Sequence, residues 1–151
     1  MSTRAAFLET IRSYLGTPWH HQGRMPGVGL DCPGPLICAA WALGLKPRSF
    51  DVNGYAREPD GLTLQRLCDE HLERIAYVES APGDVLLCRF KGGHPRHLGI
   101  LSALTDGRVY WIHADDKRDG ERGGRVREAR LEFSPRYMML VQAYRVPGLD
   151  G

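Results

Sequence analysis

Long apolar runs are missing from this sequence. None of its stretches approaches the roughly 20 consecutive apolar residues that a membrane-spanning helix requires. Residues 1–15 mix charged with apolar side chains, so they lack the continuous apolar core of a secretory signal. We therefore expect a chain with no membrane span that is cytoplasmic as synthesised.

A strong charge of one sign is missing as well. Lys and Arg number 20 against 18 Asp and Glu, which leaves a formal net charge of +2. This value is too small for the electrostatic attraction by which proteins hold the phosphates of nucleic acids. We predict that the protein has no nucleic acid partner.

Cysteine is scarce, with four residues at positions 32, 38, 68 and 88. Their spacing shows neither the close pairs of a structural zinc site nor the density of a disulfide scaffold, so we expect reduced thiols. His20, His21, His113 and Cys32 are suitable residue types for an alternative zinc site, but their spacing matches no zinc pattern. We predict that the protein needs no metal and no organic cofactor.

The chain does have the composition of an ordinary globular protein, 42% hydrophobic and 25% charged, and a length suited to one domain over 1–151. Apolar residues recur at helical spacing in 3–15, after position 32, and in 63–72. Short β-rich runs follow at 74–78, 84–90, 97–103, 108–114, 125–131 and 139–146. This order predicts an α+β fold in which N-terminal helices pack on a mostly antiparallel sheet of about five to six strands.

Cys32 stands at the most informative point of the helical half. Residues 16–30 hold too many glycines and prolines for regular structure, and they lead to Cys32 at the start of an apolar helical run. The first turn of a helix has unpaired N–H groups and a partial positive charge, so a thiol there ionises more easily. The pattern predicts a nucleophile, whereas Cys38, Cys68 and Cys88 lie within apolar periods and are interpreted as core residues.

A thiol nucleophile needs a base, and histidine has a suitable pKa. His97 begins one predicted strand and His113 lies in the next. A three-residue loop at 105–107 would place His113 opposite Gly99, so that both histidines share a face, whereas a two-residue turn would separate them. We expect the shared face to be the one on which the cysteine helix packs.

Several segments, taken in order, resemble one family. LGTPW, HQGR and DCPG are similar to the YLGTPY, HQGR and DC[AS]G segments of the NlpC-like cell-wall cysteine peptidases, particularly their phage-associated branch. PGDVLLCRF and HLGIL resemble that family's PGD strand and histidine strand, and WIHA resembles the strand of its third catalytic residue. The resemblance spans about 10–147, most of the chain.

This resemblance implies a papain-like fold of the NlpC type, with Cys32 as nucleophile, His97 as base and His113 as the residue that orients the His97 ring. The implied reaction is hydrolysis of D-γ-glutamyl-diamino acid bonds in peptidoglycan stem peptides through a Cys32 acyl-enzyme. Trp19 replaces the family's usual tyrosine and offers one N–H donor near the oxyanion or substrate. Asp31 is expected to order the loop or to contact the substrate's amine.

Pro33 departs from the family pattern, in which a small polar or apolar residue follows the cysteine. Proline has no N–H, so the oxyanion would rely on the Cys32 N–H and on a side chain of the loop. This departure favours an alternative interpretation, in which a phage or prophage tail assembly or wall-binding module keeps the fold with little or no activity. Phage tail proteins would then be partners, and the protein would be associated with virions.

Overall fold

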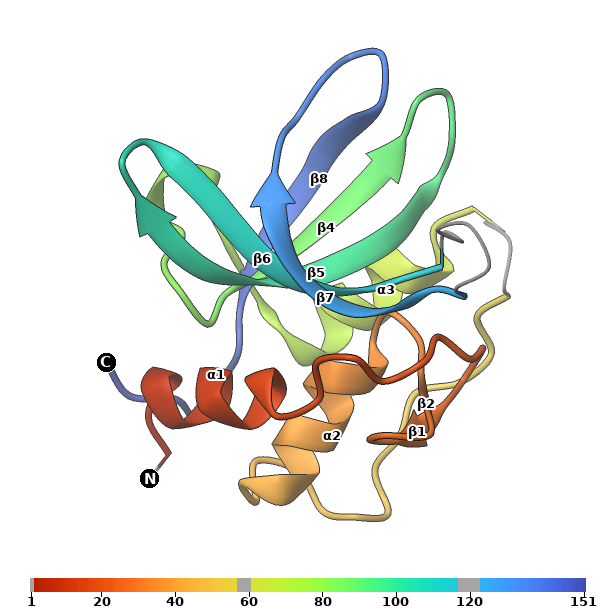
Figure 1. Cartoon of the computed structure of the whole chain (residues 1–151), viewed down its shortest axis with the longest axis vertical. Coiled ribbons are helices and arrows are strands. Elements are labelled where there is room, and N and C mark those ends of the chain that lie inside the picture. Colours follow the sequence, from red (N-terminus) through yellow and green to blue (C-terminus); the bar gives the residue numbers. More distant parts are fainter. Residues whose placement is uncertain (1, 57–60, 117–122) are drawn as a thin grey trace.

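The computed structural model describes residues 2–56, 61–116 and 123–151. Its α-helices are α1 (Arg4–Arg12), α2 (Gly34–Ala42) and α3 (Thr63–His71). Figure 1 shows α1 and α2 side by side beneath a strongly curved sheet. The predicted α+β fold, with N-terminal helices packed on an antiparallel sheet, is confirmed.

The large sheet has six strands in the order β3-β8-β4-β5-β6-β7, and all neighbours pair antiparallel. The strands are β3 (Glu73–Ile75), β4 (Val85–Phe90), β5 (Pro95–Thr105), β6 (Arg108–Asp115), β7 (Arg125–Leu131) and β8 (Met138–Arg145). The first strand is shorter than predicted, because a 3-10 helix occupies Tyr77–Glu79. Strands β5 and β6, which carry the two candidate histidines, lie inside the sheet.

Helix α1 begins at a side-chain cap, Thr3. The Thr3 hydroxyl accepts a hydrogen bond from the Ala6 N–H at 3.1 Å and so satisfies one of the open donors of the first turn. Phe7 and Ile11 are fully buried on the face toward the sheet. Leu15 was expected on the same apolar stripe but is 41% exposed, because the helix ends at Arg12 and the chain turns away.

The loop at 16–30 is more regular than its composition predicted. It contains a small antiparallel hairpin of β1 (Arg24–Met25) and β2 (Gly29–Leu30). Gly27, with φ of +81°, makes the turn, and its N–H donates to the Thr17 hydroxyl at 2.8 Å. The prediction that this loop lacks regular structure is therefore wrong, since its glycines shape a hairpin.

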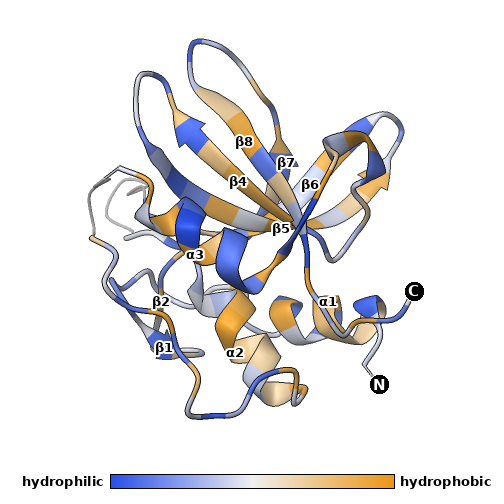
Figure 2. Cartoon of the chain, turned by 180° about the vertical axis from the view of Figure 1, so that it is seen from behind, coloured by the Kyte–Doolittle hydropathy of each residue, from blue (hydrophilic) through white to orange (hydrophobic). Residues whose placement is uncertain are grey.

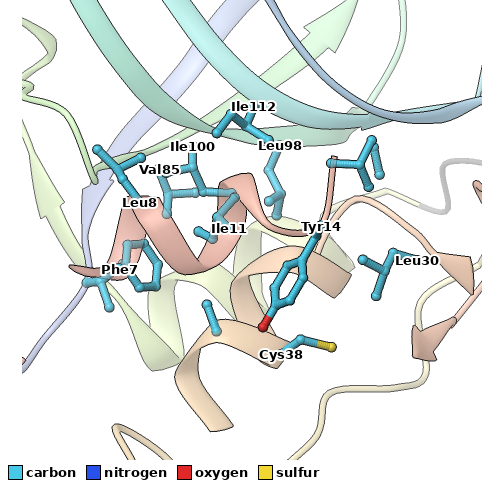
Figure 3. Packing of buried hydrophobic residues seen from close by; sticks show 14 of the residues in the cluster. Phe7, Leu8, Ile11, Tyr14, Leu30, Cys38, Val85, Leu98, Ile100 and Ile112 are labelled. Carbon is cyan, nitrogen blue, oxygen red and sulfur yellow. The ribbon is translucent and has the colours of Figure 1, made fainter. Parts of the chain in front are cut away.

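Successive side chains of a strand point to opposite faces, and Figure 2 shows that apolar residues predominate along β4 and β8. One face packs on the helices: Figure 3 shows Ile100 and Ile112 above Phe7 and Ile11. The other face carries a second buried cluster of Leu86, Cys88, Trp111, Leu131, Met138 and Ala143. The sheet thus separates a helix-covered face from an opposite face, and these two names are kept below.

The turn between β5 and β6 differs from the predicted one. Thr105 pairs with Arg108, so the turn has only two central residues, Asp106 and Gly107. Both have positive φ, +52° and +69°, as hairpin turns that follow the twist of the strands require. The predicted three-residue loop is wrong.

The prediction that His97 and His113 share a face is nevertheless right, because a β-bulge replaces the missing loop residue. The register shifts between Leu101 and Ala103, and from there Ile100 pairs with Ile112. A bulge adds one residue to one strand and thereby moves the following side chains to the other face. His97 and His113 consequently lie on the same face.

Candidate active site

Cys32 lies directly before the N-cap of α2 rather than within its first turn. The helix begins at Gly34, with Pro33 as N-cap residue. The Cys32 Sγ lies 3.8 Å from the carbonyl oxygen of Arg96, in β5, and the N–H of Leu98 also points to the sulfur. The thiol therefore contacts the backbone on both sides of His97.

The environment of the Cys32 thiol does not lower its pKa, contrary to the expectation from a helix start. Burial raises this pKa strongly, and the neighbouring Asp31 carboxylate raises it further. The hydrogen bond from Leu98 opposes this change but is the smaller effect. These effects favour the protonated form of the thiol.

His97 and His113 form a direct pair. The His97 Nε2 lies 2.7 Å from the His113 Nδ1, a hydrogen-bond distance, and the ring planes are 80° apart. This contact matches the predicted neighbourhood of the two histidines. The Nε2 nitrogen of His97 is thus engaged with His113.

The two histidines lie on the opposite face of the sheet, not on the helix-covered face as expected. The His97 ring packs against Trp111 and Phe90 of the second cluster, whereas the adjacent Leu98 is buried among the helix-facing residues. The expectation is wrong because residues 97 and 98 alternate in direction and the larger apolar side chain takes the core.

A cleft near the start of β5 is lined both by Cys32, from the helical side of the sheet, and by His97, from the opposite face. Its walls include Cys32, His97, Trp19, Asp31, Tyr55, Phe90, Arg96 and Asp116. Cys32 comes from the helical side, and His97 comes from the strand end. The candidate nucleophile and the candidate base therefore border the same cavity without sharing a packing face.

Asp31 lies at the centre of a hydrogen-bond network beside Cys32, and its expected roles, ordering the loop or contacting the substrate's amine, stay predictions. It is 2% exposed, and both of its carboxylate oxygens accept hydrogen bonds. The donors are the Gln22 N–H at 2.7 Å, the Arg24 guanidinium at 2.8 Å and the Tyr55 hydroxyl at 2.5 Å. Arg24 also binds Asp51 at 2.9 Å, so the network joins two loops beside the cleft.

The sequence patterns predict no role for Arg24 or Tyr55. Arg24 stands in the HQGR segment, so a signal existed, and the paired Asp31 lay seven residues further on. Tyr55 gave no local signal, because it lies in a polar connecting loop and is 24 residues from its partner in sequence. Its pKa is raised by burial and by the Asp31 carboxylate, so the hydroxyl remains a donor.

Trp19 lies at the wall of the cleft that it was predicted to border. Its backbone N–H donates to the Gly124 carbonyl at 2.8 Å, and its backbone forms a β-bridge with Leu30. The indole lies near the His21 ring, with centroids 6.5 Å apart. Its assignment to the oxyanion or the substrate stays a prediction.

The zinc alternative finds no corresponding geometry among the described residues, where no group of three or more His, Cys, Asp or Glu side chains gathers as metal ligands. His20 in particular is exposed, and its Nδ1 lies 3.0 Å from the His21 carbonyl. Across the same described ranges, no helix has the length and apolarity to cross a membrane.

Comparison with solved structures defines the class of fold. The NlpC/p60 domain of the peptidoglycan hydrolase SagA matches over 95% of this chain and 99% of its own, with a TM-score of 0.56 and 22% identity. A protein of the NLP/P60 family from Staphylococcus aureus subsp. aureus Mu50, described as similar to lipoprotein, matches with a TM-score of 0.58 and 19% identity. That match covers 98% of this chain and 42% of the other.

The chain therefore has the NlpC/p60 fold, as its motifs predicted. No family model and no curated protein matches the sequence. Neither solved structure bears on the phage-associated branch, which stays a prediction.

Proposed function

We propose that this protein is a cysteine peptidase that hydrolyses D-γ-glutamyl-diamino acid bonds in peptidoglycan stem peptides. The observation that carries the proposal is the 2.7 Å contact of His97 with His113 beside a cleft that Cys32 also lines. A thiol, a base and a group that orients the base are the parts that acyl transfer through a covalent intermediate requires. The substrate class is supported by the fold shared with a domain of a peptidoglycan hydrolase.

Proton transfer precedes or accompanies attack in this mechanism, because burial and Asp31 keep the Cys32 thiol protonated. His97 Nδ1 takes the thiol proton as the sulfur attacks the peptide carbonyl. For Nδ1 to accept, His97 must carry its own proton on Nε2 and donate it to the His113 Nδ1. The proposed mechanism thus fixes the tautomers of both rings.

The tetrahedral intermediate collapses when His97 returns the proton to the leaving amine, and a thioester on Cys32 remains. Water, activated by the same His97 nitrogen, then hydrolyses the thioester and regenerates the thiol. Pro33 supplies no N–H, so the Cys32 N–H and a cleft side chain such as Trp19 stabilise the oxyanion. Asp31 acts by holding the loop in place through Arg24.

Purified stem peptides test this proposal. Incubation with the protein should release fragments cut between the γ-glutamyl group and the diamino acid, as mass spectrometry can identify. Cys32→Ala should remove this activity. Cys38→Ala is the matched control, because Cys38 is a buried thiol of α2 that does not line the cleft. Equal activity in Cys32→Ala and the unaltered protein would refute the peptidase.

The raised pKa of Cys32 and the presence of Pro33 favour a second candidate, a wall-binding or phage tail module that retains the fold with little activity. Such a module would co-sediment with purified cell-wall sacculi without releasing peptides. Its binding would be the same in Cys32→Ala. Release of peptides in proportion to enzyme concentration would exclude it.

A further inference from the structure

Trp111 occupies a central position beside the histidine pair, although neither the motifs nor the proposed mechanism assigns it a role. Its side chain is 2% exposed within the second cluster. The indole stacks on the His113 ring, with centroids 4.7 Å apart and planes at 19°. The same indole meets the His97 ring edge-on, with centroids 5.3 Å apart and planes at 86°.

The backbone of β5 fixes the position of this indole. A Cβ atom on Gly99 would lie 2.4 Å from the Trp111 ring, so any other residue there would displace it. Gly99 itself is buried and pairs with Leu86 of β4. The glycine of the HLGIL segment therefore creates the space in which Trp111 contacts both histidines.

We propose that Trp111 is a positioning residue for the His97–His113 pair. Its ring holds the two imidazole planes at nearly right angles, which directs Nε2 of one at Nδ1 of the other. Its π face also stabilises the positive charge that develops when His97 accepts the thiol proton and shares it with His113. This inference rests on the proposed peptidase function and assigns a further residue to it.

Several other titratable or charged groups surround His97 and His113 and also influence their pKa values, so a test of Trp111 must leave these groups in place. Arg127 is the cross-strand partner of His113, and Cys32 and Asp31 face His97 from the helical side. The remaining titratable or charged groups along the cleft and its continuation over the opposite face are His21, Tyr55, Arg96, Asp115, Asp116, Arg130, Glu132 and Tyr137. Substitution of Trp111 alters none of these groups directly, so a change in histidine titration reports on the indole.

Trp111→Leu and Trp111→Phe separate the indole's effects. In Trp111→Leu we expect kcat to fall about tenfold to thirtyfold with KM within about twofold, because the lost interaction acts on the charged state. Nitrogen-detected NMR titration should show lower pKa values for His97 and His113, by about one. Trp111→Phe retains an aromatic face, so its kcat and its histidine pKa values should remain close to those of the unaltered protein.

Leu86→Ala is the matched control, because Leu86 is fully buried in the same cluster and lines neither part of the cleft. It should lower the melting temperature without changing the histidine pKa values. Trp111→Leu with kcat and histidine pKa values equal to those of Leu86→Ala would overturn the proposal.

If Trp111→Leu does not fold, Gly99→Ala tests the same proposal. This variant keeps the Trp111 indole, but the added Cβ displaces the indole from the two histidines. It should reproduce the lower kcat and the lower pKa values, and unaltered values would overturn the proposal. Refutation of the proposed peptidase function is distinguishable from refutation of the Trp111 role, because it would appear as equal activity in Cys32→Ala and the unaltered protein. A peptidase that depends on Cys32 but is indifferent to Trp111 would remove only the positioning role.

Discussion

The two faces of the sheet differ although the same strands form both. On the helix-covered face, Leu98, Ile100 and Ile112 are buried against α1 and α2. On the opposite face, the same two strands place His97 and His113 around Trp111. Neighbouring residues of one strand therefore lie in different surroundings, because one face packs on the helices and the other carries the candidate histidines. Substitutions at neighbouring positions should separate stability from activity.

The largest effect is expected from His97→Ala, which removes the proposed base on the opposite face. Peptide release should fall about a thousandfold, within the range typical of general acid–base groups. The melting temperature should change by only about 3 °C, because the ring is half-buried and contributes little to the helix-covered core. Kinetics and thermal unfolding of the same preparation check both values. Loss of folding would contradict the division of roles.

Ile112→Ala tests the helix-covered face next to Trp111. Ile112 is fully buried, so the lost contacts and the resulting cavity should reduce the free energy of unfolding by about 2–5 kcal/mol. Urea denaturation measures this loss. The folded fraction should retain the peptidase activity per molecule, and a loss as large as that of His97→Ala would show that the two faces are not independent.

The rate of Cys32 alkylation tests the raised pKa of this thiol. Because its pKa is raised, the thiolate fraction at neutral pH is small, and the rate with iodoacetamide should rise about tenfold per pH unit between about pH 7 and 9 without a plateau. Asp31→Asn removes a negative charge that raises this pKa, so the rate at fixed pH should increase about threefold to tenfold. Peptide mapping of the labelled protein identifies the site. A plateau near pH 7 would contradict the raised pKa.

The smallest effect is expected at Arg12, which joins α1 to β7 at the rim of the helix-covered face. Its guanidinium lies 3.1 Å from Glu128, and the two side chains are 43% and 29% exposed. Water screens such a pair, so Arg12→Ala should cost under about 1 kcal/mol and leave activity unchanged. Denaturation at low and high salt measures the pair. A cost that salt does not reduce would indicate packing of the Arg12 stem rather than charge.

Local sequence patterns predicted most of the elements but misplaced several of their details. The period of the apolar residues gave the helices and strands, and the turn residues gave their approximate ends. The hairpin of β5 and β6, which carry His97 and His113, shows what local sequence patterns cannot predict. Asp106 and Gly107 adopt a two-residue turn that by itself would place the histidines on different faces, and only the bulge at 101–103 returns them to the same face. Bulges depend on packing between strands, which the hairpin sequence does not specify alone.

The sequence likewise predicted one part of the candidate site and not the other. Cys32, His97 and His113 were selected from the residue types, their order and the flanking motifs. The network of Arg24 and Tyr55 around Asp31 was not foreseen, because its members belong to separate loops that meet only in the folded chain. The face of the histidines was also predicted incorrectly, since the alternation along a strand does not say which face the helices will cover.

The sequence by itself determined the α+β order of elements and the position of the thiol ahead of a helix. These properties follow from short-range periodicity and residue chemistry, which act wherever the chain lies. Only the tertiary structure decided that a bulge brings His97 and His113 to one face, that Trp111 packs against both histidines and that the Cys32 thiol has a raised pKa. All three depend on distances or on the exclusion of water between separate segments of the chain, and these are fixed only when the strands and loops pack together.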